Sequence, residues 1–292
     1  MGNETVIRLS FFFSVFTLVA LWELLKPRRT LTSIKVMRWF NNLAIIFLNT
    51  VIVRLLIPFI AVDMAFLAKE NGWGLLNIVE LPYWVKIVGG VIALDFVIYL
   101  QHVMFHAVPA LWRLHMVHHA DLDFDVTTGL RFHPIEMILS MVIKLAMVYI
   151  FGTPVMAVII FEVLLNTVAM FNHGNIFIPE HIDRIVRLFL VTPDMHRVHH
   201  SVVIRETNSN FGFNLPWWDY LLGTYRAQPA VGHQSMVIGL AQFRDARRLT
   251  LPWLIILPII GEIGDYPINN NKKSRGDIDS QKEVEKKPLP QK

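Results

Sequence analysis

The chain of 292 residues is apolar for a protein in water, since 54% of its residues are hydrophobic, 17% are charged and its mean hydropathy is +0.46. It contains no cysteine, which excludes disulfides, iron–sulfur clusters and thiolate zinc sites, so any metal must be held by nitrogen or oxygen. The net charge of +4 does not indicate nucleic-acid binding, because the basic residues gather in one connection and no groove-reading motif accompanies them.

Several apolar segments approach the length of about 20 residues that a helix needs to cross a bilayer. The last two are separated only by Gly152 and Thr153, so residues 135–171 are predicted to form a transmembrane hairpin that returns to the side it left. The first is followed by the sequence Lys-Pro-Arg-Arg at 26–29 instead of a small-residue cleavage site, which favours a retained anchor over a signal peptide. In chain order the segments are 9–25, 43–67, 87–100, 135–151 and 154–171.

Basic residues in the connection after the first segment predict the orientation of the chain in the membrane. Short connections rich in Lys and Arg stay in the cytoplasm, which places the connection 26–38 on that side. If each later segment crosses the membrane once, segments 102–133 and 173–233 both lie on this cytoplasmic face. The basic residues of this connection are Lys26, Arg28, Arg29, Lys35 and Arg38.

The predicted fold is an all-α integral membrane protein of about five hydrophobic helical segments, including the 135–171 hairpin, with a cytosolic histidine-rich helical cap. The stretch 251–260 is apolar but contains Pro252 and Pro258 and is too short to span, so we expect an interfacial element or a packed loop. The expected parts are N-terminal transmembrane segments and loops at 1–88, a histidine-bearing domain at 89–227, a membrane-associated segment at 228–268 and a disordered polar tail at 269–292.

Most of the histidines form a regular pattern. His102 and His106 are four positions apart, and the sequence H-x-x-H-H occurs both at 115–119 and at 196–200. On a helix, positions i, i+3 and i+4 share one face, so each group is predicted to direct its imidazoles the same way. Two such groups on one side of the membrane favour a metal site over isolated histidines at headgroup level. The full set is His102, His106, His115, His118, His119, His173, His196, His199 and His200.

This set of imidazoles exceeds the roughly six ligands that one metal ion takes, so it predicts two metal ions. With nitrogen ligands alone, iron and copper are the redox-active candidates and zinc is the redox-inactive one. The spacing of the histidines does not choose among these metals.

Polar residues near the histidines are candidates for orienting them. Asp95 lies seven positions before His102 on the same helical stripe, and Asn166 lies seven positions before His173. Asp95 is expected either to orient a ligand or to form a structural hydrogen bond with another helix. Asn166 is a candidate for holding a metal-bound water. His133 precedes the hairpin and is expected near the site, as a ligand or as a residue that supports one.

At these histidine motifs the chain resembles the fatty acid hydroxylase superfamily, which includes sterol desaturases and C-4 methylsterol oxidases. The likeness extends to the surrounding sequence and covers about residues 90–227. It is similar to the bacterial sterol-desaturase-like branch at 127–136, 171–175, 192–201, 210–213 and 218–225.

The resemblance implies a bacterial inner-membrane enzyme of lipid biosynthesis, with a non-haem diiron centre on the cytoplasmic face and a catalytic domain at 89–227. Such an enzyme uses O₂ and external electrons to hydroxylate or desaturate a sterol-like or fatty acyl lipid. By this resemblance the eight histidines of the three motifs are iron ligands, and His173 and His133 match further histidine positions of the family. The sequence after His133-Pro134 lacks the two glycines of a fused cytochrome b5 domain, which implies a separate electron donor of ferredoxin or cytochrome b5 type with its reductase.

Two other functions fit the same residues. An ether-lipid or carotenoid monooxygenase would use the same iron site on a different lipid. A non-enzymatic metal-binding or transport protein would use the histidines for binding and release, and it predicts ligands along the membrane-crossing path. The histidines of this chain instead flank the predicted spans on one side, which favours an enzyme.

Overall fold

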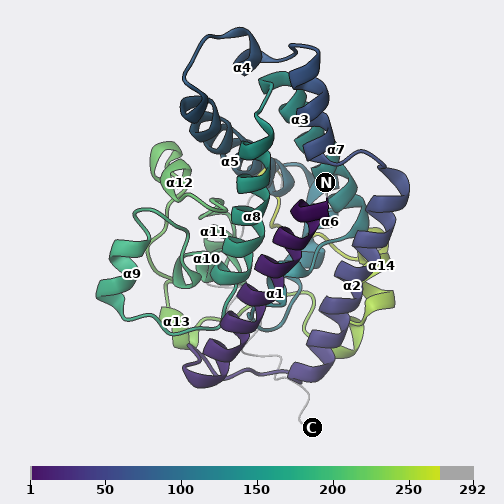
Figure 1. Ribbon diagram of the computed structural model, residues 1–292. Coiled ribbons are helices and arrows are strands. Elements are labelled where there is room, and N and C mark those ends of the chain that lie inside the picture. The colour runs from purple at the N-terminus through teal and green to yellow at the C-terminus, as the bar shows by residue number, and fades with distance from the viewer. Residues whose placement is uncertain (1, 270–292) are drawn as a thin grey trace.

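The computed structural model describes residues 2–269, and the predicted tail lies almost entirely outside this range. The described residues form helices joined by loops, with no β-strand among them (Figure 1). Five stretches are long and apolar enough to cross a membrane, which confirms the predicted all-α membrane fold. They are Val6–Leu25, Lys35–Ile78, Tyr83–Ala107, Pro134–Phe151 and Val155–Asn172.

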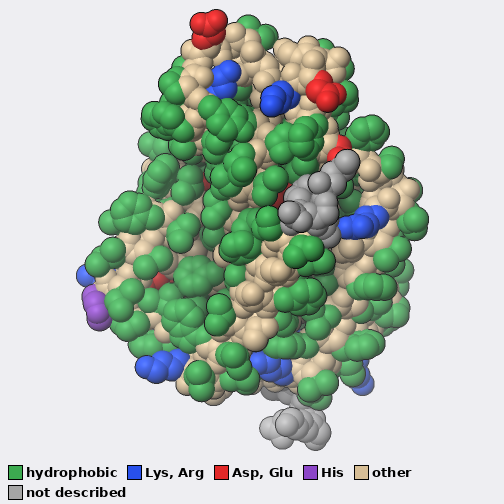
Figure 2. Space-filling model, in the orientation of Figure 1, with side chains coloured by type: hydrophobic (Ala, Val, Ile, Leu, Met, Phe, Trp, Pro, Cys, Tyr) green, Lys and Arg blue, Asp and Glu red, His purple; other side chains and the backbone are tan. Residues whose placement is uncertain are grey.

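The long helices carry large apolar side chains on their outer surfaces. Figure 2 shows such side chains over much of one face of the molecule, with most charged side chains near its two ends. Phe13 on α1 (Gly2–Leu25) is 61% exposed and Phe47 on α2 (Lys35–Leu56) is 71% exposed. Exposure of this much apolar surface to water costs free energy, whereas contact with the hydrocarbon of a bilayer does not. These faces are therefore suited to contact lipid.

The second apolar segment differs from the sequence-based prediction. Residues 43–67 were expected to form one span, but α2 ends at Leu56 and α3 (Ala61–Glu70) begins after four intervening residues. Pro58 lies in the break, and a proline both lacks an N–H donor and disfavours helical backbone in the residue before it. Asp63 then accepts a hydrogen bond from the backbone N–H of Ile60 at 3.1 Å, so it supports the start of α3 instead of lying within a span.

The predicted hairpin forms close to its predicted bounds, from α7 (Pro134–Phe151) and α8 (Val155–Asn172). Gly152 ends α7 in the left-handed conformation with φ 62°, which a residue with a side chain adopts only with strain. It packs on Gly74, where an added Cβ would lie 2.1 Å from the Gly152 nitrogen. This contact joins the hairpin turn to the loop before α4 (Leu75–Ile78), at the end far from the histidines (Figure 1).

The basic connection after α1 packs against the histidine-bearing segments. Pro27 pairs with Ile176 in an isolated antiparallel bridge, and Arg28 forms an ion pair with Asp194 at 3.1 Å. The hydroxyls of Thr32 and Ser33 donate to Asp123. The connection and both histidine-bearing segments therefore share one end of the molecule, as the counting of crossings predicted.

The cap at this end is built from short helices. The stretch 251–260, expected as an interfacial element or packed loop, is helix α14, and Leu254 and Leu257 join Trp112 and Met116 of α6 in a buried apolar cluster. Pro252 is tolerated in the first turn of α14, where its missing N–H costs no hydrogen bond. The remaining helices that carry or surround the site are α5 (Tyr83–Ala107), α6 (Pro109–His119), η1 (Thr128–Leu130), α9 (Glu180–Val186), α10 (Pro193–His199), α11 (Ile204–Thr207), α12 (Trp217–Leu222), α13 (Gly232–Ser235) and η2 (Ala246–Arg248).

A buried ion network fixes α2 to the loop after α6. Arg38, counted above among the basic residues that indicate topology, is only 7% exposed and donates to Asp121 at 2.7 and 2.9 Å and to Asp125 at 2.6 Å. Burial opposes a charge on Asp121, but Arg38 and Arg131 hold the pKa of this carboxyl well below its usual range. Ion pairs with Arg38 and Arg131 therefore hold the loop that follows the histidine motif of α6.

Candidate metal centre

The nine histidines of the predicted set converge at the buried core of the cap. Each offers a ring nitrogen to one of two groups, and within a group these nitrogens all lie within 4.8 Å of one another. All nine side chains are buried. The first group is His102, His106, His115, His119 and His199, and the second is His118, His173, His196 and His200.

Each H-x-x-H-H motif is divided between the two groups. His115 and His119 of α6 are in the first group. His118, the residue before His119, points in a different direction from the helix and is in the second group. The motif at 196–200 is divided in the same way. His199 is in the first group, and His196 and His200 are in the second. Each motif therefore ties both groups to one short helix, and the groups must lie side by side.

Backbone carbonyls determine the protonation of four of these rings. The Nδ1 atoms of His102 and His199 lie 2.8 Å from the carbonyl oxygens of Phe211 and Ser209. His173 lies 2.7 Å from the Ala169 oxygen, and His118 lies 3.2 Å from that of Arg131. A carbonyl oxygen can only accept a hydrogen bond, so Nδ1 must carry the proton. In a neutral ring this leaves Nε2 with a free lone pair, which is the state that a metal ligand requires.

Two side chains do the same for His106 of α5 and His115 of α6. His115 Nδ1 lies 2.6 Å from Glu136 Oε1, and both side chains are buried. His106 Nδ1 lies 3.0 Å from Asn208 Oδ1, and the amide of Asn208 is oriented because its Nδ2 donates to the Tyr266 carbonyl at 2.7 Å. A carboxylate bonded to a ligating histidine both fixes the ring and makes it a stronger donor to a metal.

The second group contains close nitrogen–nitrogen contacts that a bound cation would explain. His173 Nε2 lies 3.2 Å from His118 Nε2 and 3.1 Å from His196 Nε2. Because Nδ1 carries the proton in both His118 and His173, their facing Nε2 atoms both present lone pairs, which repel. Two imidazole ligands at right angles on one metal, each about 2.1 Å away, would have nitrogens about 3.0 Å apart. The spacing therefore fits two ligands of a common ion.

Other ring nitrogens in the cluster are buried without any hydrogen-bond partner. Both nitrogens of His119 and of His200 are in this state, as are the Nε2 atoms of His102, His106, His115 and His199. An unpaired buried polar atom costs about 1–3 kcal/mol, so this many in one place would strongly destabilise the fold by themselves. Coordination of a metal by one nitrogen of each ring would remove much of that cost, and the residues fit a metal centre.

The cluster is also electrostatically prepared to hold cations. Burial, followed by the neighbouring histidines, lowers the pKa of His118, His119, His196, His199 and His200 well below the ordinary value of 6.5. Burial likewise lowers the pKa of His173 to about 4. These rings are therefore neutral near pH 7 and do not need to lose a proton before they bind a metal.

Aromatic side chains enclose the rings and keep water out. Phe132 stacks on His118 with ring centroids 4.4 Å apart and planes inclined by 10°, and Phe124 lies 5.4 Å from His173. Trp112 covers His106 at 4.8 Å. These contacts leave the imidazoles few alternative rotamers, so the site is preorganised.

Asp219 supports the site indirectly, through the loop that contains Phe211. Its carboxylate accepts hydrogen bonds from the backbone N–H groups of Phe211 and Gly212, both at 2.8 Å, and thus fixes the loop whose Phe211 carbonyl orients His102. Gly212 is required by space, because an added Cβ would lie 2.7 Å from Asp219 Oδ2. Burial raises the pKa of Asp219 to about 6.

His133, predicted as a ligand or as a residue that supports one, is not brought into either group. Its Nδ1 accepts a hydrogen bond from the backbone N–H of Ile135 at 3.2 Å, so its Nε2 carries the proton and donates to the Ile255 carbonyl at 3.1 Å. Both nitrogens are occupied, and the residue is the N-cap of α7.

Substitution of His133 by asparagine tests this assignment. Asparagine is a good N-cap, so H133N is expected to retain the full metal content and to lose at most about 1 kcal/mol of stability. Metal analysis and thermal unfolding of the purified variant measure both quantities. Loss of a metal ion at unchanged folding would return His133 to the ligands.

The two predicted supporting residues, Asp95 and Asn166, do not touch the histidines. Asp95 Oδ2 accepts a hydrogen bond from Trp218 Nε1 at 2.7 Å, which is the structural alternative considered above. The Asn166 side chain donates to the Glu162 carbonyl one turn earlier on α8, at 2.7 Å. In both cases a separation of seven residues along a helix is about 10 Å, too far for contact with the histidine.

Sequence reasoning missed the residues that do orient the rings. Glu136 follows His133-Pro134-Ile135 and was noted only as part of a motif, although a carboxylate beside a histidine cluster is a usual partner for a ligand. Asn208 lies 102 positions from His106, and no local pattern connects them. The other partners are backbone carbonyls, which leave no signal in the sequence.

The part of the chain that carries the histidines is similar to known proteins. Residues 87–224 match the model of the fatty acid hydroxylase family. The chain is 30% identical over 150 residues to the ornithine lipid hydroxylase OlsE of Rhizobium tropici, covering 51% of this chain and 44% of that protein. It is 28% identical over 179 residues to alkylglycerol monooxygenase of Xenopus tropicalis, covering 56% and 37%.

Alkylglycerol monooxygenase of Homo sapiens is 27% identical over 154 residues, covering 51% of this chain and 32% of the human protein. The chain thus covers less than half the length of each of these relatives. No solved structure matches the chain significantly. The family match includes the first two histidine motifs, His173 and the motif at 196–200.

Proposed function

We propose that the chain is a membrane-bound non-haem diiron oxidoreductase that hydroxylates a lipid, because residues 87–224 match the model of the fatty acid hydroxylase family. The observation that carries the proposal is the convergence of nine buried imidazoles into groups of five and four. Six of these rings also have Nδ1 tied to an oxygen, which directs their Nε2 atoms to a metal.

The two groups would each hold one iron ion, the first through five histidines and the second through four. Iron bound in this way would supply the activation of O₂ and the oxidation of an unactivated C–H bond. The overall reaction consumes a lipid C–H, O₂, two electrons and two protons, and yields an alcohol and water. The protein's own part is to fix the rings in one tautomer, to enclose them in aromatic side chains, and to exclude bulk water.

The position of the cluster supports a lipid substrate. His102 and His106 lie in the last turns of α5, and His173 directly follows α8, so both groups lie where membrane-crossing helices end. A lipid held in the bilayer can therefore approach the cluster without leaving the membrane. The relatives named as hydroxylases and monooxygenases favour hydroxylation over desaturation.

An ether lipid is the second candidate substrate, because several of the matched relatives are named alkylglycerol monooxygenases. The alternative of a metal transporter receives less support. The rings are buried and individually fixed by Nδ1 partners, and they lie at the ends of the spans instead of along them. Such an arrangement favours permanent retention of a metal over its binding and release.

The location and the electron supply belong to the same proposal. The basic connection packs against the cap, which favours the cytoplasmic face of the membrane for the active site. The proposed membrane is a bacterial inner membrane. Electrons would come from a separate ferredoxin or cytochrome b5 type donor with its reductase.

Lipid analysis of cells that express the chain tests the reaction. Growth under ¹⁸O₂ is expected to give a lipid that is heavier by one ¹⁸O atom than its precursor and is absent from cells expressing His118→Ala. A lipid that has lost two hydrogens without gaining oxygen would contradict hydroxylation and favour desaturation. No change in any lipid class, with an active electron donor present, would contradict the enzymatic function.

A further inference from the structure

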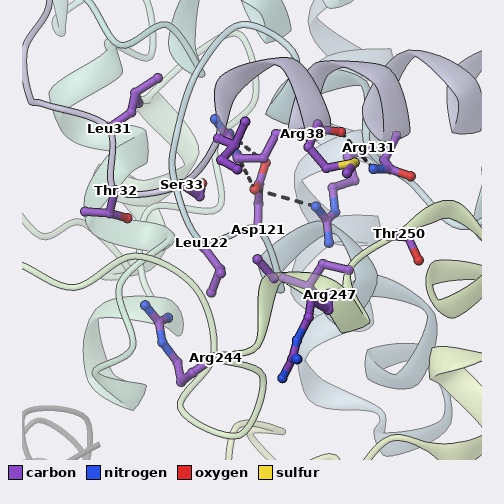
Figure 3. Close-up of a pocket in the computed structure, with 15 residues that line it drawn as sticks. Leu31, Thr32, Ser33, Arg38, Asp121, Leu122, Arg131, Arg244, Arg247 and Thr250 are labelled. Atoms are coloured by element: carbon purple, nitrogen blue, oxygen red, sulfur yellow. Dashed lines mark hydrogen bonds and ion pairs between the residues drawn. The ribbon is translucent and has the colours of Figure 1, made fainter. Parts of the chain in front are cut away.

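A cavity of about 530 Å³ lies on the cap, apart from the histidine cluster. It is bounded by the connection before α2, the first turns of α2, the loop after α6 and the segment 244–250 (Figure 3). Four arginines and one aspartate line it, so cationic side chains outnumber anionic ones in its wall. These residues are Arg38, Arg131, Arg244, Arg247 and Asp121.

One of these arginines presents an unused donor. Arg131 is 1% exposed, its Nε donates to the Val117 carbonyl at 2.9 Å, and its Nη1 lies 3.5 Å from Asp121 and 3.4 Å from Asn42. Its Nη2 is buried and has no hydrogen-bond partner. Figure 3 shows the guanidinium directed into the pocket, where an anion would satisfy it. A buried, unpaired cationic donor is costly unless a ligand completes it.

The other arginines differ in how many of their N–H donors are already engaged within the protein. Every donor nitrogen of Arg38 is already bonded to an aspartate. Arg244 donates one Nη to the Ile238 carbonyl at 2.6 Å. Arg247 is paired with Asp245 at 3.1 Å, but this ion pair is exposed and so contributes little to stability. Arg247 can therefore turn toward a ligand in the pocket at small cost.

The remaining wall is partly polar, with Thr32, Ser33, Asn41 and Thr250, and partly apolar. Leu31, Ile34, Met37 and Leu249 line the pocket. Ile34 and Met37 are 66% and 53% exposed, at the point where α2 enters its candidate membrane span. The pocket thus combines cationic donors with apolar surface at the boundary between water and bilayer. This combination suits an amphiphile with an anionic headgroup and acyl chains that continue along α2.

The pocket is separate from the metal centre. The Arg131 carbonyl oxygen faces His118 Nδ1 at 3.2 Å, whereas the Arg131 side chain bonds Val117 and lines the pocket. The backbone at 117–118 and at 131 therefore forms a wall between the pocket and the histidines. An occupant of the pocket would not reach the ligand nitrogens.

We propose that this pocket binds the phosphate headgroup of an anionic membrane lipid, with Arg131 and Arg247 as its ligands to phosphate. The site is independent of the proposed oxidation, because it requires neither metal nor turnover. A phosphate could also be supplied by a free anion, but the apolar part of the wall at the membrane boundary favours a lipid.

Native mass spectrometry of the full chain in detergent tests this site, with phosphatidylglycerol and phosphatidylcholine added at equal concentration. One phosphatidylglycerol is expected to remain bound under conditions that remove phosphatidylcholine. Arg247→Glu is expected to weaken this retention at least tenfold, as loss of a charge-assisted hydrogen bond does. Arg131→Met is expected to weaken it as well.

The matched control is Arg248→Glu, which changes the same charge one residue away at an exposed position outside the pocket. Equal losses in R247E and R248E, or equal retention of both lipids, would mean diffuse attraction and overturn the proposal. Displacement of the bound lipid by millimolar inorganic phosphate, with phosphate remaining bound, would reassign the pocket to a free anion. Thermal unfolding of R247E is expected to match the unmodified chain, because Arg247 is exposed.

Discussion

Replacing His118 by alanine is expected to abolish lipid hydroxylation and to reduce the bound metal from about two ions per chain to about one or none. His118 contributes one of the four nitrogens of the second group, and its Nε2 lies 3.2 Å from that of His173. Loss of a residue that merely orients a ligand lowers metal affinity or activity by about 10–100-fold, so loss of a ligand should exceed that. Metal analysis and product formation on the same preparation measure the effect.

Two comparisons make the His118 result specific. His119→Ala, at the adjacent residue, removes a histidine of the first group and is expected to abolish turnover equally, because the proposed reaction needs both groups. His181→Ala removes an exposed histidine of α9 and is expected to change neither metal content nor turnover. Full activity of H118A with unchanged metal would contradict the assignment of the second group.

Replacing Glu136 by glutamine is expected to lower metal affinity by about 10–100-fold while the fold is retained. Glu136 Oε1 lies 2.6 Å from His115 Nδ1, and its Oε2 atom is buried without a partner. The amide of glutamine preserves the size and an acceptor oxygen but removes the negative charge that strengthens the bond and makes His115 a better donor. Metal retained against increasing concentrations of a chelator measures the loss.

Glu180→Gln is the control for this substitution, because Glu180 forms an exposed ion pair with Arg184 on α9. Its removal is expected to leave the chelator curve unchanged. A curve for E136Q that coincides with those of E180Q and the unmodified chain would mean that Glu136 does not tune the metal.

Local spacing predicted most of what lies within one helix or one turn. The hairpin followed from the short interruption at Gly152, and the shared faces of His102 with His106 and of His115 with His119 followed from helical periodicity. Topology then placed the distant motifs at one end. The break between α2 and α3 was missed, because hydropathy averages over a single proline that interrupts the helix at Pro58.

The division of the histidines into two groups could not be read from the sequence. It depends on how α5, α6, α8 and α10 cross, and this is set by packing between residues far apart in the chain. The partners of Nδ1 were hidden for the same reason, since Phe211 is 109 positions from His102 and acts through its backbone. Asp95 and Asn166 form their hydrogen bonds away from the histidines, because a shared helical stripe does not imply contact over two turns.

The most direct test of the central claim is the metal content of the unmodified chain, purified in detergent from iron-supplemented cells. Iron, zinc and copper are quantified per chain, which distinguishes a diiron centre from the other metals that imidazole accepts. We predict about two iron ions per chain, matching the two histidine groups. Stoichiometric zinc with no iron, or a single ion per chain in protein that hydroxylates lipid, would contradict the diiron assignment.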